Sequence, residues 1–236
     1  MSPDVKQKIQ IFLSVAIVLA VLRTGYIFYE RSTYKPPEPK KTVALDPDYY
    51  VTPKKLRAYD LKDAKALTQG PVWVRDGYRF TYFPYDRVRQ HADFKHEAGL
   101  LLPIEKLQIT DVVLDATPGA PDQKQLLAVF ERGGKAYAFA FGVMKEGAYQ
   151  IYADDMLFLQ DPHELYKHWP ADVWEAVDKH EVKVGMKELQ AELSLGLGVL
   201  KGSGLGSERV IEYPNGGKRL TIVFKDGKAA EIRPAS

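Results

Sequence analysis

The chain has 236 residues, carries a formal net charge of +2, and is 45% hydrophobic and 27% charged. This composition is typical of a chain that buries a core, so it excludes a wholly disordered or fibrous protein. The absence of cysteine excludes a disulfide scaffold, a thiolate metal site, a cysteine nucleophile and a lipid attached to cysteine. The near-neutral charge argues against a dedicated nucleic-acid binder.

The first feature along the chain is an apolar stretch over residues 9–29, within an anchor segment that we assign to residues 1–30. A helix over this stretch, rising about 1.5 Å per residue, would span roughly 30 Å, which is the thickness of a bilayer's hydrocarbon core. The sequence therefore predicts one transmembrane helix. A cleaved signal peptide and a buried helix of a soluble domain stay open as alternatives, although no convincing cleavage site follows the stretch. The predicted anchor residues are Ile11, Phe12, Leu13, Val15, Ile17, Val18, Leu19, Val21, Leu22, Tyr26 and Phe28.

The charges beside this stretch leave the membrane orientation open. Lys6 and Lys8 precede it, and four Lys or Arg residues follow it between positions 31 and 41. Counting these residues alone directs the large domain to the cytoplasm. A short basic tail before a short apolar stretch is instead typical of an export signal-anchor, which places the large domain outside the cytoplasm.

Two segments follow the anchor. Residues 31–55 contain five prolines and several lysines, which predicts an extended, semi-rigid tether. Residues 56–160 form a predicted β-rich domain that begins with a short helix or turn over residues 56–67. The Gly133-Gly134 pair between two apolar stretches predicts a β-hairpin. Several short strands close together predict a small antiparallel barrel or curled sheet, with an SH3-like barrel as one form.

Residues 161–236 are predicted to combine helices with an α/β module. Asp161 followed by Pro162 is a typical helix start, and Pro170 begins a second helix. Further along, the pattern predicts a short amphipathic helix, a glycine-rich loop and a three-stranded meander. The predicted fold class is therefore α+β: one N-terminal transmembrane helix, a small antiparallel barrel-like domain, then helices and a C-terminal helix packed on the meander.

This last module resembles a known family. The matching positions are a Gly-Met step, a helix with a Gln, a Leu-Gly end, a strand ending in Tyr, and a Phe-x-Asp-Gly-Lys turn: Gly185, Met186, Gln190, Leu195, Gly196, Tyr213 and Phe224 to Lys228. The module resembles the BamE/SmpA outer-membrane lipoprotein domain and the wider group of beta-lactamase-inhibitor-protein-like modules. The resemblance covers about a fifth of the chain and implies non-enzymatic binding in the bacterial envelope. That family carries a lipid on cysteine, and here the N-terminal apolar segment would take its place.

Aromatic and arginine side chains alternate over residues 73–89, and this combination is frequent in the centre of protein interfaces. Stacking on nucleic-acid bases or sugars is an alternative use of the same side chains. A strand with one core face and one charged face would explain the pattern without binding. The candidate interaction surface is Arg75, Arg79, Phe83, Tyr85, Arg87 and Arg89.

No catalytic, cofactor-binding or metal-binding residue is predicted, and no cofactor is expected. Asp154, Asp155, Asp161 and Glu164 form an acidic stretch, but adjacent carboxylates of a strand point to opposite faces. His163 and His168 are five positions apart, so they do not share a helix face as zinc-binding histidines do. The glycine-rich loop follows a helix and opens a strand, which is the reverse of a phosphate-binding loop.

The sequence therefore predicts a membrane-anchored, non-enzymatic protein of the bacterial envelope that binds other proteins, as an accessory or scaffold subunit of a larger membrane complex. Its expected partners are the membrane, through the N-terminal helix, and other membrane or envelope proteins; no nucleic acid or small-molecule substrate is expected. The expected location is the inner membrane, with the large domain outside the cytoplasm. An envelope hydrolase using residues 154–164 and a cytoplasm-facing nucleic-acid-binding protein remain alternatives.

Overall fold

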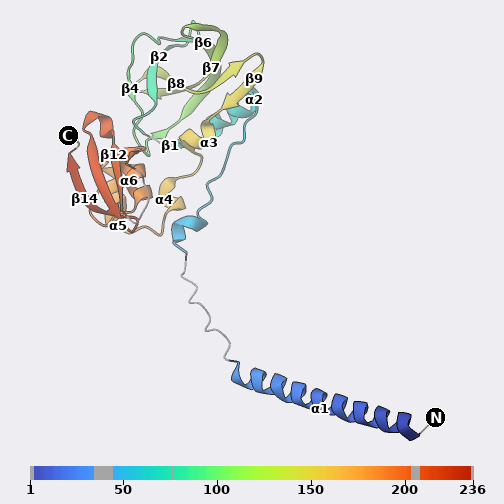
Figure 1. Cartoon of the computed structure of the whole chain (residues 1–236). Helices are drawn as coiled ribbons and strands as arrows, with labels where there is room; N and C mark the ends of the chain where they lie inside the picture. Colours follow the sequence, from blue (N-terminus) through green and yellow to red (C-terminus); the bar gives the residue numbers. More distant parts are fainter. Residues whose placement is uncertain (1–2, 35–44, 76, 203–207, 235–236) are drawn as a thin grey trace. The chain divides into compact units, whose positions relative to one another are not determined.

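The computed structural model describes residues 3–34, 45–75, 77–202 and 208–234 (Figure 1). The chain divides into two compact units, residues 1–45 and residues 46–236. Residues 46–55, which the sequence assigns to the tether, belong to the folded unit and include the short 3-10 helix η1 (Pro47–Tyr50). The boundary expected between residues 160 and 161 also falls inside this one unit.

The first unit contains one long helix, α1 (Pro3–Thr33). Residues Ile11–Thr33 are long and apolar enough to cross a membrane, and none of this segment is buried within the protein. The Thr24 hydroxyl donates a 2.8 Å hydrogen bond to the Ala20 carbonyl, so this polar group is satisfied inside the helix. Every predicted anchor residue lies in α1 and is exposed. The helix is thus compatible with a single-pass membrane anchor or with a signal sequence.

The second unit is built around an antiparallel sheet that curls into a half-barrel, as the sequence predicts in outline (Figure 1). The central order is β3-β2-β8-β7-β6, with β4 paired to β2 and β9 paired to β8. Gly133 and Gly134, both at positive φ, form the predicted turn between β7 and β8. The strands are β2 (Thr81–Asp86), β3 (His91–Ala92), β4 (Gly99–Leu100), β6 (Ile109–Thr117), β7 (Ala120–Arg132), β8 (Lys135–Lys145) and β9 (Ala148–Ile151).

A small second sheet and short helices complete this β-rich region. The small sheet has the order β10-β1-β5. Phe130, Phe139 and Phe141, all fully buried, form part of the core that these elements enclose. Leu56 and Ala58 pack against the same core from the segment that precedes the helices. The elements are β1 (Val72–Val74), β5 (Lys106–Leu107), β10 (Leu157–Phe158), α2 (Leu61–Ala64), η2 (Lys65–Gln69) and α3 (Ala153–Met156).

Three helices link this region to the C-terminal sheet: α4 (Pro162–Leu165), α5 (Ala171–Asp178) and α6 (Glu188–Leu195). Asp161 caps α4 as predicted, because its carboxylate accepts a 2.9 Å hydrogen bond from the His163 amide. Trp169 and Trp174 share a buried cluster with Trp73 of β1 and Phe158 of β10. These tryptophans therefore fix the helices to the small sheet.

The C-terminal sheet has four strands in the order β11-β12-β13-β14, which corrects the predicted three-stranded meander. The additional strand lies in the glycine-rich segment that the sequence reads as a loop, where Val199 pairs with Glu212 and Leu200 with Ile211. Residues 203–207 of that loop lie outside the described residues. The strands are β11 (Val199–Lys201), β12 (Glu208–Tyr213), β13 (Leu220–Lys225) and β14 (Lys228–Pro234), and the turn between β12 and β13 is the 3-10 helix η3 (Asn215–Gly217).

Candidate functional site

A groove of about 690 Å³ lies beside the β2–β3 hairpin and is the candidate interaction site. Aromatic rings and prolines form its apolar part, and charged side chains of both signs lie around them. Two of the predicted surface residues, Tyr85 and Arg89, line it. The lining residues are Pro84, Tyr85, Asp86, Arg89, His91, Asp93, Phe94, Lys95, Ala116, Thr117 and Pro118.

Asp86 shapes the hairpin that presents Arg89. Its carboxylate Oδ1 accepts hydrogen bonds from the amides of Val88 at 2.8 Å and Arg89 at 3.0 Å. These bonds from a carboxylate to amides two and three residues later are typical of an Asx turn. Gln90 then adopts a left-handed φ of 52° and returns the chain into β3. The turn leaves Arg89 on the rim of the groove, with its side chain 83% exposed.

Asp115 holds the back of the groove together. Its side chain is only 7% exposed, and it lies in β6. One oxygen lies 2.9 Å from His91 Nδ1 and accepts the Ala116 amide, and the other accepts the Ala92 amide at 2.8 Å. Since His91 and Ala92 make up β3, one buried carboxylate fixes this short strand against β6.

Aromatic contacts support the apolar part of the groove. Phe83 and Phe94 meet edge to face with ring centroids 5.3 Å apart, and His91 packs on Phe94 at 5.9 Å. Burial raises the pKa of Tyr85, and the carboxylates of Asp111 and Asp115 raise it further. The Tyr85 hydroxyl therefore stays protonated at neutral pH and can donate a hydrogen bond.

The rim of the groove carries charged side chains of both signs, and its carboxylates already accept local hydrogen bonds. Asp93 accepts the Lys95 amide at 3.2 Å and lies 2.8 Å from His96 Nδ1. These contacts lower the pKa of Asp93, with the bond to His96 as the main cause. Arg89 approaches Asp86 only to 3.7 Å. Within the described residues, the Lys95 ammonium has no ion-pair partner, so both cations can meet an acidic ligand.

The structure divides the predicted interaction surface. Arg75 lies over the Phe158 ring at 5.7 Å, and Arg79 lines a separate hollow of about 350 Å³ with Phe80. Arg87 forms a 2.7 Å ion pair with Glu131. Phe83 packs beneath the groove, so only Tyr85 and Arg89 of the six line it directly. Arg75 and Arg79 both precede β2, which begins at Thr81, and Tyr78 between them has a left-handed φ of 62°.

Sequence reasoning missed His91, Phe94 and Lys95. The turn between β2 and β3 contains no glycine, so it lacks the usual hairpin signal. Asp86 was the available signal, because Asp favours the first position of a turn. The role of Asp115 depends on a contact 24 positions away, which no local pattern encodes.

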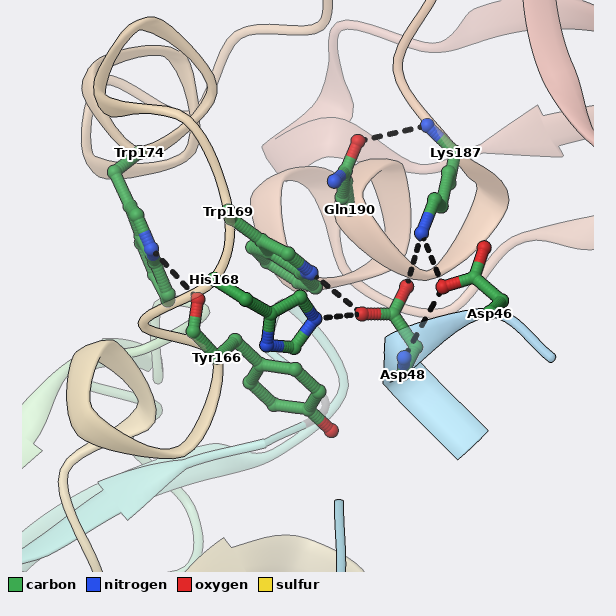
Figure 2. Close-up of polar contacts among 8 residues, drawn as sticks. All are labelled: Asp46, Asp48, Tyr166, His168, Trp169, Trp174, Lys187 and Gln190. Carbon is green, nitrogen blue, oxygen red and sulfur yellow. Dashed lines mark hydrogen bonds and ion pairs between the residues drawn. The ribbon is translucent and has the colours of Figure 1, made fainter. Parts of the chain in front are cut away.

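A second polar cluster fixes the first residues of the folded unit (Figure 2). The Asp48 carboxylate accepts hydrogen bonds from Trp169 Nε1 at 2.7 Å and Lys187 Nζ at 2.8 Å, and it lies 2.5 Å from His168 Nε2. Lys187 also contacts Asp46 at 2.5 Å. The Trp169 ring stacks on Tyr166 with centroids 4.5 Å apart. We call these four polar partners together with Asp48 the Asp48 cluster: Asp46, Asp48, His168, Trp169 and Lys187.

The cluster shifts the pKa values of its charged members. Burial raises the pKa of Asp48, but the hydrogen bonds from Lys187, Trp169 and His168 outweigh burial and leave it below the ordinary value. The hydrogen bond from Lys187 is the main reason that the pKa of Asp46 is lowered. Burial lowers the pKa of Lys187, but its bonds to both carboxylates outweigh burial and raise it. The carboxylates of Asp46 and Asp48 and the ammonium of Lys187 are therefore all charged at neutral pH. The residues of the Asp48 cluster hold the chain at the point where the folded unit begins.

The acidic stretch and the nearby histidines have structural contacts. The two oxygens of Asp154 accept the backbone amides of Leu56 at 2.5 Å and Arg57 at 3.0 Å. His163 contacts Asp161 and Asp178 and stacks on Trp174 with centroids 4.0 Å apart. Among the residues that the structure describes, no group of three His, Asp or Glu side chains is arranged to hold a metal ion.

In comparisons with protein-family models, curated proteins and solved structures, none matches this chain. The groove and the Asp48 cluster therefore have to be interpreted from their own geometry.

Proposed function

We propose that this chain is a single-pass protein of the bacterial inner membrane whose folded unit, outside the cytoplasm, binds another protein without catalysing a reaction. The observation that carries the proposal is the unburied apolar surface of α1, since the protein covers none of Ile11–Thr33. Apolar side chains lie around the whole helix, as expected for a helix surrounded by lipid. The resemblance of the C-terminal module to envelope-binding domains supports the same location.

The groove beside β2 and β3 is the proposed binding site of the partner. Tyr85 and Phe94 supply apolar area, and Arg89 and Lys95 supply positive charge that is not neutralised by strong local ion pairs. Aromatic and arginine side chains are enriched among the residues that dominate binding energy. A partner segment with an apolar side chain next to a carboxylate complements this arrangement. The chain would then act as an accessory subunit that presents this groove to a membrane complex.

Site-specific photo-crosslinking in native membranes tests the proposal. A photoreactive amino acid is placed at Ala116 or at Lys95 in the full chain, both of which line the groove, and a control carries it at Lys218, an exposed residue after η3. We expect one discrete adduct of the same mass from both groove positions and none from the control. Charge reversal by Arg89→Glu should reduce the adduct from position 95 by about tenfold or more, as for an interface hot spot.

Two results would contradict the binding site. One is an adduct from Lys218 that equals the groove adducts, which would mean that the crosslinks report random collisions. The other is an adduct from position 95 that Arg89→Glu leaves unchanged, because the Arg89 guanidinium then contributes nothing to recognition.

A further inference from the structure

The segment that directly follows Asp48 in the chain carries exposed tyrosines and cations on the surface of the folded unit. Tyr49, Tyr50 and Tyr59 are 77%, 70% and 79% exposed. The segment has five exposed cationic side chains and only two carboxylates, those of Asp60 and Asp63. No ion pair joins these cations to a carboxylate within the described residues. We call residues 49–65 the basic tyrosine segment, and its cations are Lys54, Lys55, Arg57, Lys62 and Lys65.

The two carboxylates of this segment already have hydrogen-bond partners. Asp60 Oδ1 accepts the Asp63 amide at 2.8 Å and caps α2. Asp63 Oδ2 accepts the Tyr59 amide at 3.1 Å. The five cations of the segment outnumber these two carboxylates, so its local excess of charge is positive and its cationic side chains are free to meet an external anion.

Contacts with the rest of the folded unit hold the basic tyrosine segment in place. The Lys54 amide donates to Gln160 Oε1 at 3.0 Å, and the Asp154 carboxylate accepts the amides of Leu56 and Arg57. Leu56 and Ala58 pack against the core. Their neighbours Lys55, Arg57 and Tyr59 are exposed. Arg57 also lines two hollows, of about 620 and 560 Å³; Lys62 and Lys65 line the first with it, and Lys55 lines the second.

The position of this segment in the chain indicates what it meets. Residues 34–45 separate the end of α1 from Asp46, the first residue of the folded unit. Twelve residues reach at most about 40 Å, whatever their conformation. If α1 spans a bilayer, the folded unit must begin within that distance of the lipid surface, and the basic tyrosine segment starts three positions later.

We propose that the basic tyrosine segment docks on the anionic headgroups of the membrane that holds α1; this inference rests on the proposed membrane anchorage. Tyrosine side chains are enriched at the membrane–water interface. Each Lys or Arg near an anionic membrane surface strengthens binding roughly fivefold. Docking would fix the orientation of the folded unit toward the bilayer.

Fluorescence quenching in lipid nanodiscs tests the docking. The full chain contains no cysteine, so Thr52→Cys provides one labelling site within the segment and Val88→Cys provides a control site on the β2–β3 turn. Discs contain either zwitterionic lipid alone or zwitterionic plus anionic lipid, and a nitroxide on the headgroups quenches nearby labels. We expect several-fold stronger quenching of the label at position 52 in anionic discs, and its loss at about 0.5 M salt as charges are screened.

Two matched variants identify the side chains involved. Lys54→Gln, Lys55→Gln, Arg57→Gln and Lys62→Gln together should reduce the quenching at position 52 to its value in zwitterionic discs. Lys135→Gln, Lys145→Gln, Lys218→Gln and Lys228→Gln together remove as many exposed charges elsewhere and should leave the quenching unchanged.

The outcomes separate the docking from the anchorage. Failure of the chain to co-elute with the discs contradicts the proposed anchorage. Co-elution with equal quenching in both lipids, or with quenching that the first variant does not alter, overturns the docking alone.

Discussion

The carboxylate of Asp48 contacts three side chains that lie 120, 121 and 139 positions further along the chain. Its side chain is 12% exposed, so these contacts form mostly away from water. Removing an acceptor from such a site leaves its donors unsatisfied, which costs about 1–3 kcal/mol. At the scale of single residues, Asp48 therefore connects the beginning of the folded unit to α6 and to the segment between α4 and α5.

We predict that Asp48→Ala lowers the free energy of unfolding by about 2 kcal/mol at neutral pH. Denaturant unfolding followed by tryptophan fluorescence measures the change. Glu97→Ala is the matched control, because Glu97 is an exposed carboxylate in a loop. An equal effect of the two substitutions would show that the Asp48 cluster contributes no stability.

The same cluster predicts a pH dependence. The folded-state pKa values of Asp46 and Asp48 lie below the ordinary 3.8, so their stabilisation is present above 3.8 and is lost as the pH falls through the lowered values. The pKa of Lys187 lies above the ordinary 10.5, so its contribution is present below 10.5 and is lost at higher pH. The stability difference between the wild type and Asp48→Ala should be flat between these limits and shrink in acid. A difference that stays constant down to about pH 2 would contradict this assignment.

At the scale of elements, the C-terminal end of α6 meets the turn before β2. Gly196 follows α6 with a φ of 81°, and a Cβ there would lie 2.3 Å from the carbonyl oxygen of Gly77. Gly119, in the turn between β6 and β7, has a similar φ of 73° but open space around it. Substituting Gly119 and Gly196 in turn therefore separates the free-energy cost of a left-handed conformation from the cost of a backbone collision.

We expect Gly119→Ala to cost about 1 kcal/mol, from the conformation alone. Gly196→Ala should cost about 3 kcal/mol, because the collision adds overpacking to the same conformational cost. Thermal and denaturant unfolding of both variants measure the difference. Similar losses for both would mean that α6 and the Gly77 turn do not pack as closely as described.

Local signals in the sequence predicted several elements correctly. The Gly133-Gly134 pair predicted the β7–β8 turn, where both glycines have positive φ, and Asp161 with Pro162 predicted the start of α4. The elements that were missed depend on distant partners. Val199 belongs to a strand because it pairs with Glu212, and η1 docks because Asp48 meets Trp169 and Lys187. Of the predicted interaction surface, only Tyr85 and Arg89 line the groove. Its other residues are brought together through the contacts of Asp86 and Asp115, which no local pattern encodes.

At the scale of the whole molecule, the chain combines an apolar helix that its own protein does not bury with a folded unit of mixed α and β structure. The two units are joined through residues 34–45, and the Asp48 cluster fixes where the folded unit begins. The proposed binding groove and basic surface would gain from the proposed anchor, because a short tether to the membrane raises the local concentration of nearby partners.

The proposed anchorage requires that α1 remains attached and holds the folded unit at a membrane. The most direct measurement is the mass of the chain recovered from native membranes after an alkaline wash and release by detergent. We expect an intact chain of 26.6 kDa in the washed membranes. A chain recovered in the soluble fraction, shortened by removal of α1, would contradict it.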